Sequence, residues 1–80
     1  MSFVYVLKSL KNGKRYVGST DLLPEDRLKE HNYGSNKFTK GNRPFILVHK
    51  EEYDTKKEAK KRENFLKSGV GRKFLDQILK

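Results

Sequence analysis

The chain has 80 residues, with 19 Lys and Arg against 10 Asp and Glu, so its formal net charge is +9. This length leaves room for one small domain and excludes a second one. The absence of cysteine excludes disulfides, thiolate zinc sites and a cysteine nucleophile. Neither a signal peptide nor an apolar stretch of membrane length is visible, so we expect one soluble, cytoplasmic domain over residues 1–80.

The positive charge predicts a polyanionic partner. A chain with this excess of cations binds nucleic acid by releasing counterions from the phosphates. We therefore expect DNA, or alternatively RNA, as the partner, with no membrane and no obligate protein partner. Charge alone predicts no reaction, because basic ribosomal proteins and RNA binders share it.

The N-terminal part predicts a β-hairpin. Two apolar, β-prone runs, Phe3–Ser9 and Arg15–Ser19, flank an Asn-Gly turn signal. Such a turn pairs positions whose numbers sum to an odd total, which places Tyr5 and Tyr16 on one face. A two-residue turn sets Tyr16 opposite Ser9, whereas a longer loop brings the two tyrosines opposite each other. The alternative for either residue is an ordinary half-buried strand tyrosine.

A short helix follows the hairpin. Asp21 is expected to cap it, and it runs from about Leu22 or Pro24 to His31. Arg27 and His31 are four residues apart and share one face, from which both reach the same phosphate. Arg27 would clamp that phosphate, and His31 would orient a tyrosine or the attacking water. The alternatives are a surface ion pair for Arg27 and a helix C-terminal cation for His31.

The segment Asn32–Pro44 is rich in turn formers and basic residues and predicts a long exposed loop. It mixes aromatic rings with cations, a combination that lets bases stack while charges follow the backbone. We predict nucleic-acid contacts at Lys37, Phe38, Lys40 and Arg43 in this loop, at Lys14 and Arg15 in the hairpin, and at Lys67. The alternative is a solvated connection with Phe38 packed into the core.

The C-terminal half predicts a strand and two helices. Phe45–Glu52 is β-prone, and Asp54 or Thr55 then caps a helix that extends to Lys67. Two glycines break the helical pattern before a last helix that must pack on the sheet. The breaking residues are Gly69 and Gly71, and the apolar stripe of the last helix is Phe74, Leu75, Ile78 and Leu79.

A carboxylate interrupts the apolar stripe of the first of these helices. The positions expected to face inward are Ala59, Glu63 and Leu66, at i, i+4 and i+7. An unpaired carboxylate facing a core is costly, so Glu63 must find a metal ion or a positive side chain. On this pattern alone the more ordinary outcome is a salt bridge, either to the neighbours of Arg62 or to a lysine of the first helix.

Four blocks in order resemble those of the GIY-YIG nuclease family. Phe3-Val4-Tyr5 stands in the GIY place without its Gly and Ile, and Tyr16-Val17-Gly18 stands in the YIG place. The segment 27–32 resembles the family's helix with Arg and His, and the segment 61–67 resembles its segment with the metal-binding Glu. The close spacing resembles that of small standalone bacterial (UPF0213-like) members, related to the N-terminal catalytic domain of UvrC.

The resemblance implies the GIY-YIG catalytic-module fold. This is an α/β (α+β) domain with a three-stranded, largely antiparallel sheet flanked by helices in the order β-β-α-β-α-α. It also implies a divalent-metal-dependent endonuclease that hydrolyses DNA phosphodiester bonds, with structure-selective or weakly sequence-specific cutting and a role in repair or recombination. The alternative is a basic DNA- or RNA-binding module that keeps the fold and does not cut.

The resemblance also implies which residues carry the chemistry. The catalytic set is Tyr5, Tyr16, Arg27, His31 and Glu63, and Glu63 holds one metal ion, Mg²⁺ or Mn²⁺. Tyr5 would lie near the nucleophilic water with support from Tyr16, although the residues themselves leave either tyrosine as the base. A nearby cation, the metal or Arg27, would favour the phenolate that a tyrosine base needs.

Overall fold

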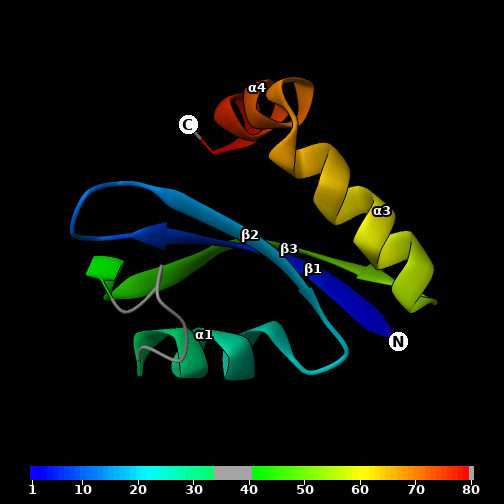
Figure 1. Cartoon of the computed structure of the whole chain (residues 1–80), viewed down its shortest axis with the longest axis horizontal. Helices are drawn as coiled ribbons and strands as arrows, with labels where there is room; N and C mark the ends of the chain where they lie inside the picture. The colour runs from blue at the N-terminus through cyan, green and yellow to red at the C-terminus, as the bar shows by residue number, and fades with distance from the viewer. Residues whose placement is uncertain (34–40, 80) are drawn as a thin grey trace.

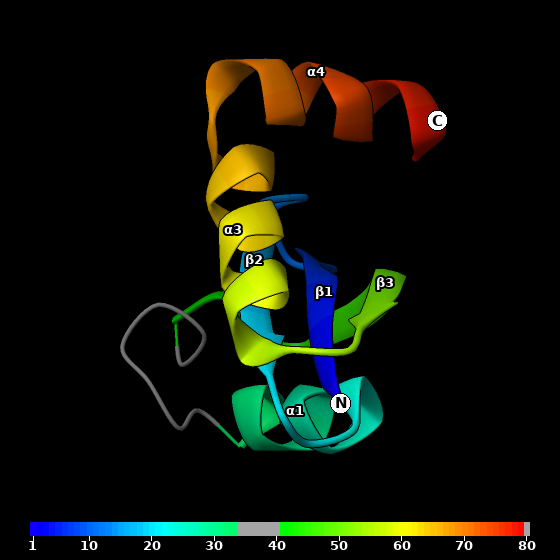
Figure 2. The ribbon, with the colours of Figure 1, turned by 90° about the vertical axis from the view of Figure 1, so that its right-hand side faces the viewer.

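A three-stranded antiparallel sheet lies between two helical layers (Figure 1). The computed structural model describes residues 1–33 and 41–79. Its elements are β1 (Ser2–Ser9), β2 (Arg15–Thr20), α1 (Pro24–Asn32), β3 (Phe45–Tyr53), α3 (Lys56–Lys67) and α4 (Gly69–Ile78). Helix α1 covers one face of the sheet, and α3 and α4 cover the other (Figure 2). The predicted α+β fold and element order are confirmed.

Strand β1 is central because it is apolar on both faces. The strand order is β2-β1-β3, so both neighbours of β1 are edge strands. Val4 and Val6 point into a core formed with α3 and α4, whereas Tyr5 and Leu7 pack with Phe45 on the side of α1. A strand that is buried on both faces belongs in the middle of a layered sheet. The sheet thus separates two small cores.

The hairpin confirms the predicted face of the tyrosines but not either predicted register. Tyr5 and Tyr16 share one face, with ring centroids 6.3 Å apart. Tyr16 pairs with Leu7, two residues away from the Ser9 partner that an Asn-Gly two-residue turn requires. The loop is longer because Ser9 Oγ accepts two of its backbone N–H groups and Gly13 adopts a φ of 76°. A two-residue shift preserves the parity and hence the shared face.

Helix α1 begins without the predicted aspartate cap. Its N-cap is Leu23, which makes no side-chain capping bond, and Pro24 opens the first turn. The Asp21 carboxylate instead accepts a hydrogen bond from Ser2 Oγ at 2.5 Å and pairs with Lys56 Nζ at 3.0 Å. The cap prediction is wrong because these two distant residues bind the carboxylate.

Helix α3 follows its sequence pattern closely. Thr55 is the N-cap, and its hydroxyl accepts the Glu58 N–H at 3.2 Å, as the capping pattern predicts. The buried residues of α3 are Ala59, Glu63 and Leu66. The predicted inward stripe is therefore confirmed, including its carboxylate.

Helices α3 and α4 meet at a tight corner. The break lies at Ser68, which ends α3 and caps α4, so Gly69 and Gly71 belong to the first turn of α4 and do not break it. A Cβ on Gly71 would lie 2.0 Å from the Phe65 carbonyl oxygen and 2.5 Å from Leu66 Cα. Glycine is needed at residue 71 because the two helices approach at backbone distance.

The predicted apolar stripe of α4 is only partly buried. Leu75 is 1% exposed and joins the core with Leu66, and Phe74 and Leu79 pack at the margin of that core. Ile78 is 44% exposed, contrary to the prediction. Ile78 borders an open cavity together with Ile46 and Val48 of β3.

Two expectations concern the chain as a whole. In residues 1–33 and 41–79 we find no helix that is both long and apolar enough for a membrane span. The greater part of the predicted loop Asn32–Pro44, residues 34–40, lies outside the described residues.

Replacing Gly71 with alanine should destabilise the domain. The added methyl group overlaps the end of α3, and overpacking of this kind lowers the free energy of unfolding by about 1–3 kcal/mol. Gly69→Ala is the matched control because a Cβ there meets nothing within 4 Å. Urea unfolding of both variants measures the difference, and equal midpoints would contradict the close approach.

Candidate active site

Residues from three elements converge between the sheet and α1. The Tyr5 hydroxyl on β1 lies 3.1 Å from His31 Nε2 on α1, and both side chains are buried. The Tyr16 ring from β2 lies 4.7 Å from the His31 ring, centroid to centroid. The structure thus assembles both predicted tyrosines and the predicted histidine into one cluster.

The Tyr5 side chain extends across the edge strand β2 at Gly18. A Cβ on Gly18 would lie 2.6 Å from the Tyr5 hydroxyl oxygen and 2.7 Å from Cζ. No side chain fits between them, so a bare backbone at residue 18 is what allows the phenol to lie over β2. The glycine of the Tyr16-Val17-Gly18 triplet therefore has a steric function in placing Tyr5.

Arg27 completes the cluster on α1. Its guanidinium is close enough to the Tyr5 phenol to work against the rise in the pKa of Tyr5. One Nη donates to Glu30, the helix ion pair that was the alternative from sequence. Arg27 Nε is buried, and within the described part of the chain it has no hydrogen-bond partner. A buried donor in this state is suited to an anion that arrives with a ligand.

The surroundings keep the tyrosine and the histidine neutral. Burial raises the pKa of Tyr5 above its ordinary 10.0, and this effect outweighs the opposing effect of Arg27. Burial lowers the pKa of His31 below 6.5, and the positive charge of Arg27 lowers it further. The hydrogen-bonded pair therefore carries no charge at neutral pH, and the imidazole can accept a proton.

Glu63 lies on the other side of β2, facing it from α3. Its carboxylate accepts the Ser19 hydroxyl at 2.6 Å and pairs with Lys67 Nζ at 2.6 Å and with Lys60 Nζ at 3.4 Å. Burial alone would raise the pKa of Glu63, but Lys67, Ser19 and Lys60 bring it below 4.5. The salt bridge expected as the alternative exists, within α3 itself.

The two halves of the site meet at adjacent residues of β2. Successive side chains of a strand point to opposite faces, so Gly18 faces Tyr5 and Ser19 faces Glu63. The negative charge of Glu63 reaches the Tyr5 phenol and contributes to its raised pKa. The single edge strand β2 thus separates the neutral cluster on one face of the sheet from the carboxylate on the other.

The donor set near Glu63 fits one divalent ion that is shared with a substrate. Among residues 1–33 and 41–79 no three His, Cys, Asp or Glu side chains come together as a metal cage. Magnesium in phosphoryl-transfer sites uses one or two carboxylates together with substrate phosphates and water. Glu63 supplies one such carboxylate. Its ammonium partners, Lys60 and Lys67, are on exposed, flexible side chains that another cation can replace.

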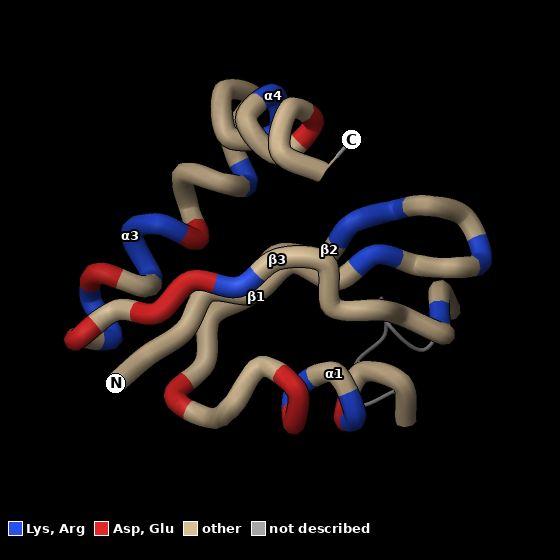
Figure 3. Tube along the Cα trace, turned by 180° about the vertical axis from the view of Figure 1, so that it is seen from behind, with Lys and Arg blue, Asp and Glu red and all other residues tan. Residues whose placement is uncertain are grey.

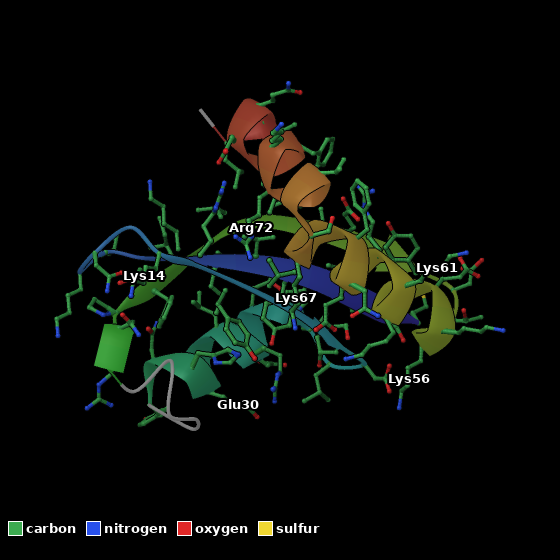
Figure 4. All side chains as sticks on the ribbon, turned by 45° about the horizontal axis from the view of Figure 1, so that its top comes forward. Lys14, Glu30, Lys56, Lys61, Lys67 and Arg72 are labelled. Atoms are coloured by element: carbon green, nitrogen blue, oxygen red, sulfur yellow. The ribbon has the colours of Figure 1, made fainter. Side chains whose placement is uncertain are left out.

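Predicted nucleic-acid contacts line a groove beside this site. Lys14, Lys67 and Arg72 border a cavity of about 650 Å³ between β2 and the helices α3 and α4 (Figure 4). Arg15 also borders it, but its guanidinium pairs with Asp76 at 2.5 Å. Seen from behind, Lys and Arg positions gather on the hairpin and on α3 (Figure 3). Arg72 was not singled out from sequence, and no motif marks it.

Arg43, the one other predicted contact within the described residues, does not border this groove. Arg43 is exposed before β3 and donates to the Asn32 carbonyl oxygen at 3.5 Å. Lys37, Phe38 and Lys40 lie outside the described residues.

A further carboxylate, which was not singled out from the sequence, links two elements of the fold. Glu51 on β3 accepts hydrogen bonds from Tyr53 and Arg62 at 2.6 and 2.9 Å, and lies 2.9 Å from His49 Nε2. Burial alone would raise its pKa, but these partners lower the pKa of Glu51 to about 2. The cluster ties β3 to α3, since Arg62 belongs to α3. The alternating polar residues of β3 were the only signal for it.

The arrangement is that of a GIY-YIG catalytic domain, whose family profile matches residues 1–74, and the chain belongs to this family. It is 43% identical over 68 residues to a UPF0213 protein of Clostridium perfringens, covering 84% of this chain and 71% of that protein. A UPF0213 protein of Staphylococcus saprophyticus is 40% identical over 77 residues, covering 95% and 92% of the two chains.

A solved relative confirms the fold. The solution NMR structure of a UPF0213 protein from Bacillus halodurans is 33% identical in sequence and matches with a TM-score of 0.57, covering 98% of this chain and 85% of that one. Family membership implies a nuclease-type function with a nucleic acid as substrate.

Replacing Gly18 with alanine should displace Tyr5. The new methyl group occupies the place of the phenol oxygen, and we expect the free energy of unfolding to fall by about 1–3 kcal/mol. NMR signals of the His31 ring should shift as its contact with Tyr5 is lost. Gly41→Ala, where a Cβ meets nothing within 4 Å, is the control for both measurements.

The buried His31 should make stability fall in mild acid. Its folded pKa lies below 6.5, so the unfolded chain binds the proton first and stability declines as the pH falls through about 6.5. Urea midpoints at pH 7.5 and 5.5 measure this decline. The difference between the two midpoints should shrink in His31→Gln and persist in His49→Gln, and an unchanged difference in His31→Gln would contradict the assignment.

Proposed function

We propose that this protein is a metal-dependent endonuclease that hydrolyses phosphodiester bonds of DNA. The observation that carries the proposal is the neutral Tyr5–His31 pair, 3.1 Å apart, beside Arg27 Nε, for which residues 1–33 and 41–79 supply no hydrogen-bond partner. A proton acceptor and an anion-binding group are two of the requirements of phosphodiester hydrolysis. The third is stabilisation of the leaving oxygen by a cation, and Glu63 across β2 is the carboxylate that would hold a divalent ion for it.

The tyrosine and the histidine would act as a relay. Water attacks the phosphorus in line with the leaving oxygen and passes its proton to the Tyr5 oxygen, while the Tyr5 proton moves to His31 Nε2. Because the pKa of Tyr5 is raised and the pKa of His31 is lowered, both groups start neutral, and the imidazole has a position for the proton. Tyr16 packs on the imidazole and holds its orientation.

Arg27 and Glu63 would handle the negative charge. Arg27 donates to a phosphate oxygen through the buried Nε and neutralises charge that develops during the displacement. Glu63 would hold one Mg²⁺ or Mn²⁺, which supplies charge neutralisation at the scissile phosphate and the leaving oxygen. Ser19 orients the Glu63 carboxylate through its hydrogen bond of 2.6 Å.

The groove favours contacts with the nucleic-acid backbone. Its charged residues, Lys14, Lys67 and Arg72, are suited to phosphates, which carry no sequence information directly. We therefore propose structure-selective or weakly sequence-specific cutting, which suits a role in DNA repair or recombination. RNA offers the same phosphates, so the assay must include it.

Cleavage of a substrate panel tests the proposal. Supercoiled, single-stranded and branched DNA and a single-stranded RNA are incubated with Mg²⁺ or Mn²⁺ and the wild type, Glu63→Gln, Tyr5→Phe or Glu52→Gln. We expect Glu63→Gln and Tyr5→Phe to lose about 100-fold or more in rate, and the exposed control Glu52→Gln to keep it. Chelation of the metal should stop cutting in every case.

Binding measured in parallel separates the enzyme from the binding module. Anisotropy titrations should show that Glu63→Gln still binds nucleic acid although it no longer cuts it. If the wild type binds every substrate and cuts none with either metal, the protein is a basic nucleic-acid-binding module with this fold.

A further inference from the structure

Lys67 belongs to two sites at once. Its ammonium lies 2.6 Å from Glu63 Oε2, the carboxylate proposed to hold the metal. The same side chain borders the basic groove together with Lys14 and Arg72. The other partner of Glu63, Lys60, is farther away at 3.4 Å and borders a separate cavity of about 380 Å³. Lys67 is therefore the cation shared by the carboxylate and the groove.

We propose that Lys67 is a latch that couples nucleic-acid binding to metal binding. Without nucleic acid its ammonium occupies the place of a cation at Glu63. When a strand enters the groove, a backbone phosphate attracts Lys67 and leaves the carboxylate free for the metal. This inference rests on the proposed function, because it takes Glu63 as the metal ligand.

Competition between like charges supports the latch. An ammonium 2.6 Å from Oε2 repels a divalent ion on the same carboxylate, so binding of the metal favours displacement of Lys67. The side chain can move, because it is 52% exposed and has a flexible four-carbon stem in the last turn of α3. Displacement is easier when the ammonium has another anion to bind.

A nucleic-acid phosphate in the groove would be the other anion for Lys67. Lys14 and Arg72 are exposed, and in the described part of the chain neither forms an ion pair. They remain available for phosphates, whereas Arg15 is held by Asp76 at 2.5 Å. A strand bound by Lys14 and Arg72 lies along the cavity that Lys67 also borders.

The coupling must be reciprocal. If the strand raises the affinity for the metal, the metal raises the affinity for the strand by the same factor. The metal would then be bound firmly only on substrate, which restricts hydrolysis to the nucleic-acid complex.

Manganese binding without nucleic acid is the first test. The electron paramagnetic resonance signal of free Mn²⁺ gives the affinity for the wild type, Lys67→Met and Lys61→Met. Lys61 is the matched control because it lies two residues before Glu63, on the opposite side of α3 (Figure 4). We expect Lys67→Met to bind Mn²⁺ at least about five-fold more tightly than the wild type, and Lys61→Met to stay within about two-fold.

The second test repeats the Mn²⁺ titration in the presence of nucleic acid. A single-stranded oligonucleotide is added in a Tyr5→Phe background, and a gel verifies that it stays intact. The strand should tighten Mn²⁺ binding at least about five-fold with Lys67 present and clearly less in Lys67→Met. Circular dichroism and urea midpoints establish that each variant is folded.

The outcomes separate the latch from the proposed metal site. Equal Mn²⁺ affinities of wild type and Lys67→Met, both weakened by Glu63→Gln, would overturn the latch and leave the metal site in place. If Glu63→Gln changes Mn²⁺ binding in neither background, the metal site and the latch both fail. Equal gains in Lys67→Met and Lys61→Met would show a general effect of charge and also overturn the latch.

Discussion

The contact between the Tyr5 phenol and the bare backbone of Gly18 is the constraint on which the site depends. Tyr5 lies on the central strand, where both faces are buried, so its hydroxyl reaches the edge of the sheet only by extending over β2. At that edge it meets His31 from α1. A side chain at residue 18 would displace the phenol. His31 of α1 would then lose its hydrogen bond to Tyr5.

Strand β2 also separates two electrostatic environments. On the side of α1, burial favours the neutral forms of Tyr5 and His31. On the side of α3, Lys67 and Ser19 favour the charged form of Glu63. In the mechanism that we propose, the relay uses the neutral groups and the metal ligand is the charged one, and a single strand lies between them.

The buried carboxylate of Glu63 and the partly buried carboxylate of Glu51 differ in how firmly their partners are held. Glu51 is surrounded by Tyr53, His49 and the planar fork of Arg62, whose guanidinium lies 4.9 Å from the centre of an aromatic ring. Those partners are held by packing, so no oxygen of Glu51 is available. The ammonium partners of Glu63 are more than half exposed and are replaceable by another cation.

Local periodicity and capping patterns were enough to predict the strands, the inward position of Glu63 and the Thr55 cap. They also predicted that both tyrosines share one face, because parity survives a change in loop length. The hairpin register, the partners of Asp21 and the position of Lys67 between Glu63 and the groove became visible only in the folded chain. These features depend on groups distant in the chain, which compete for the same hydrogen bonds and charges once the layers pack together.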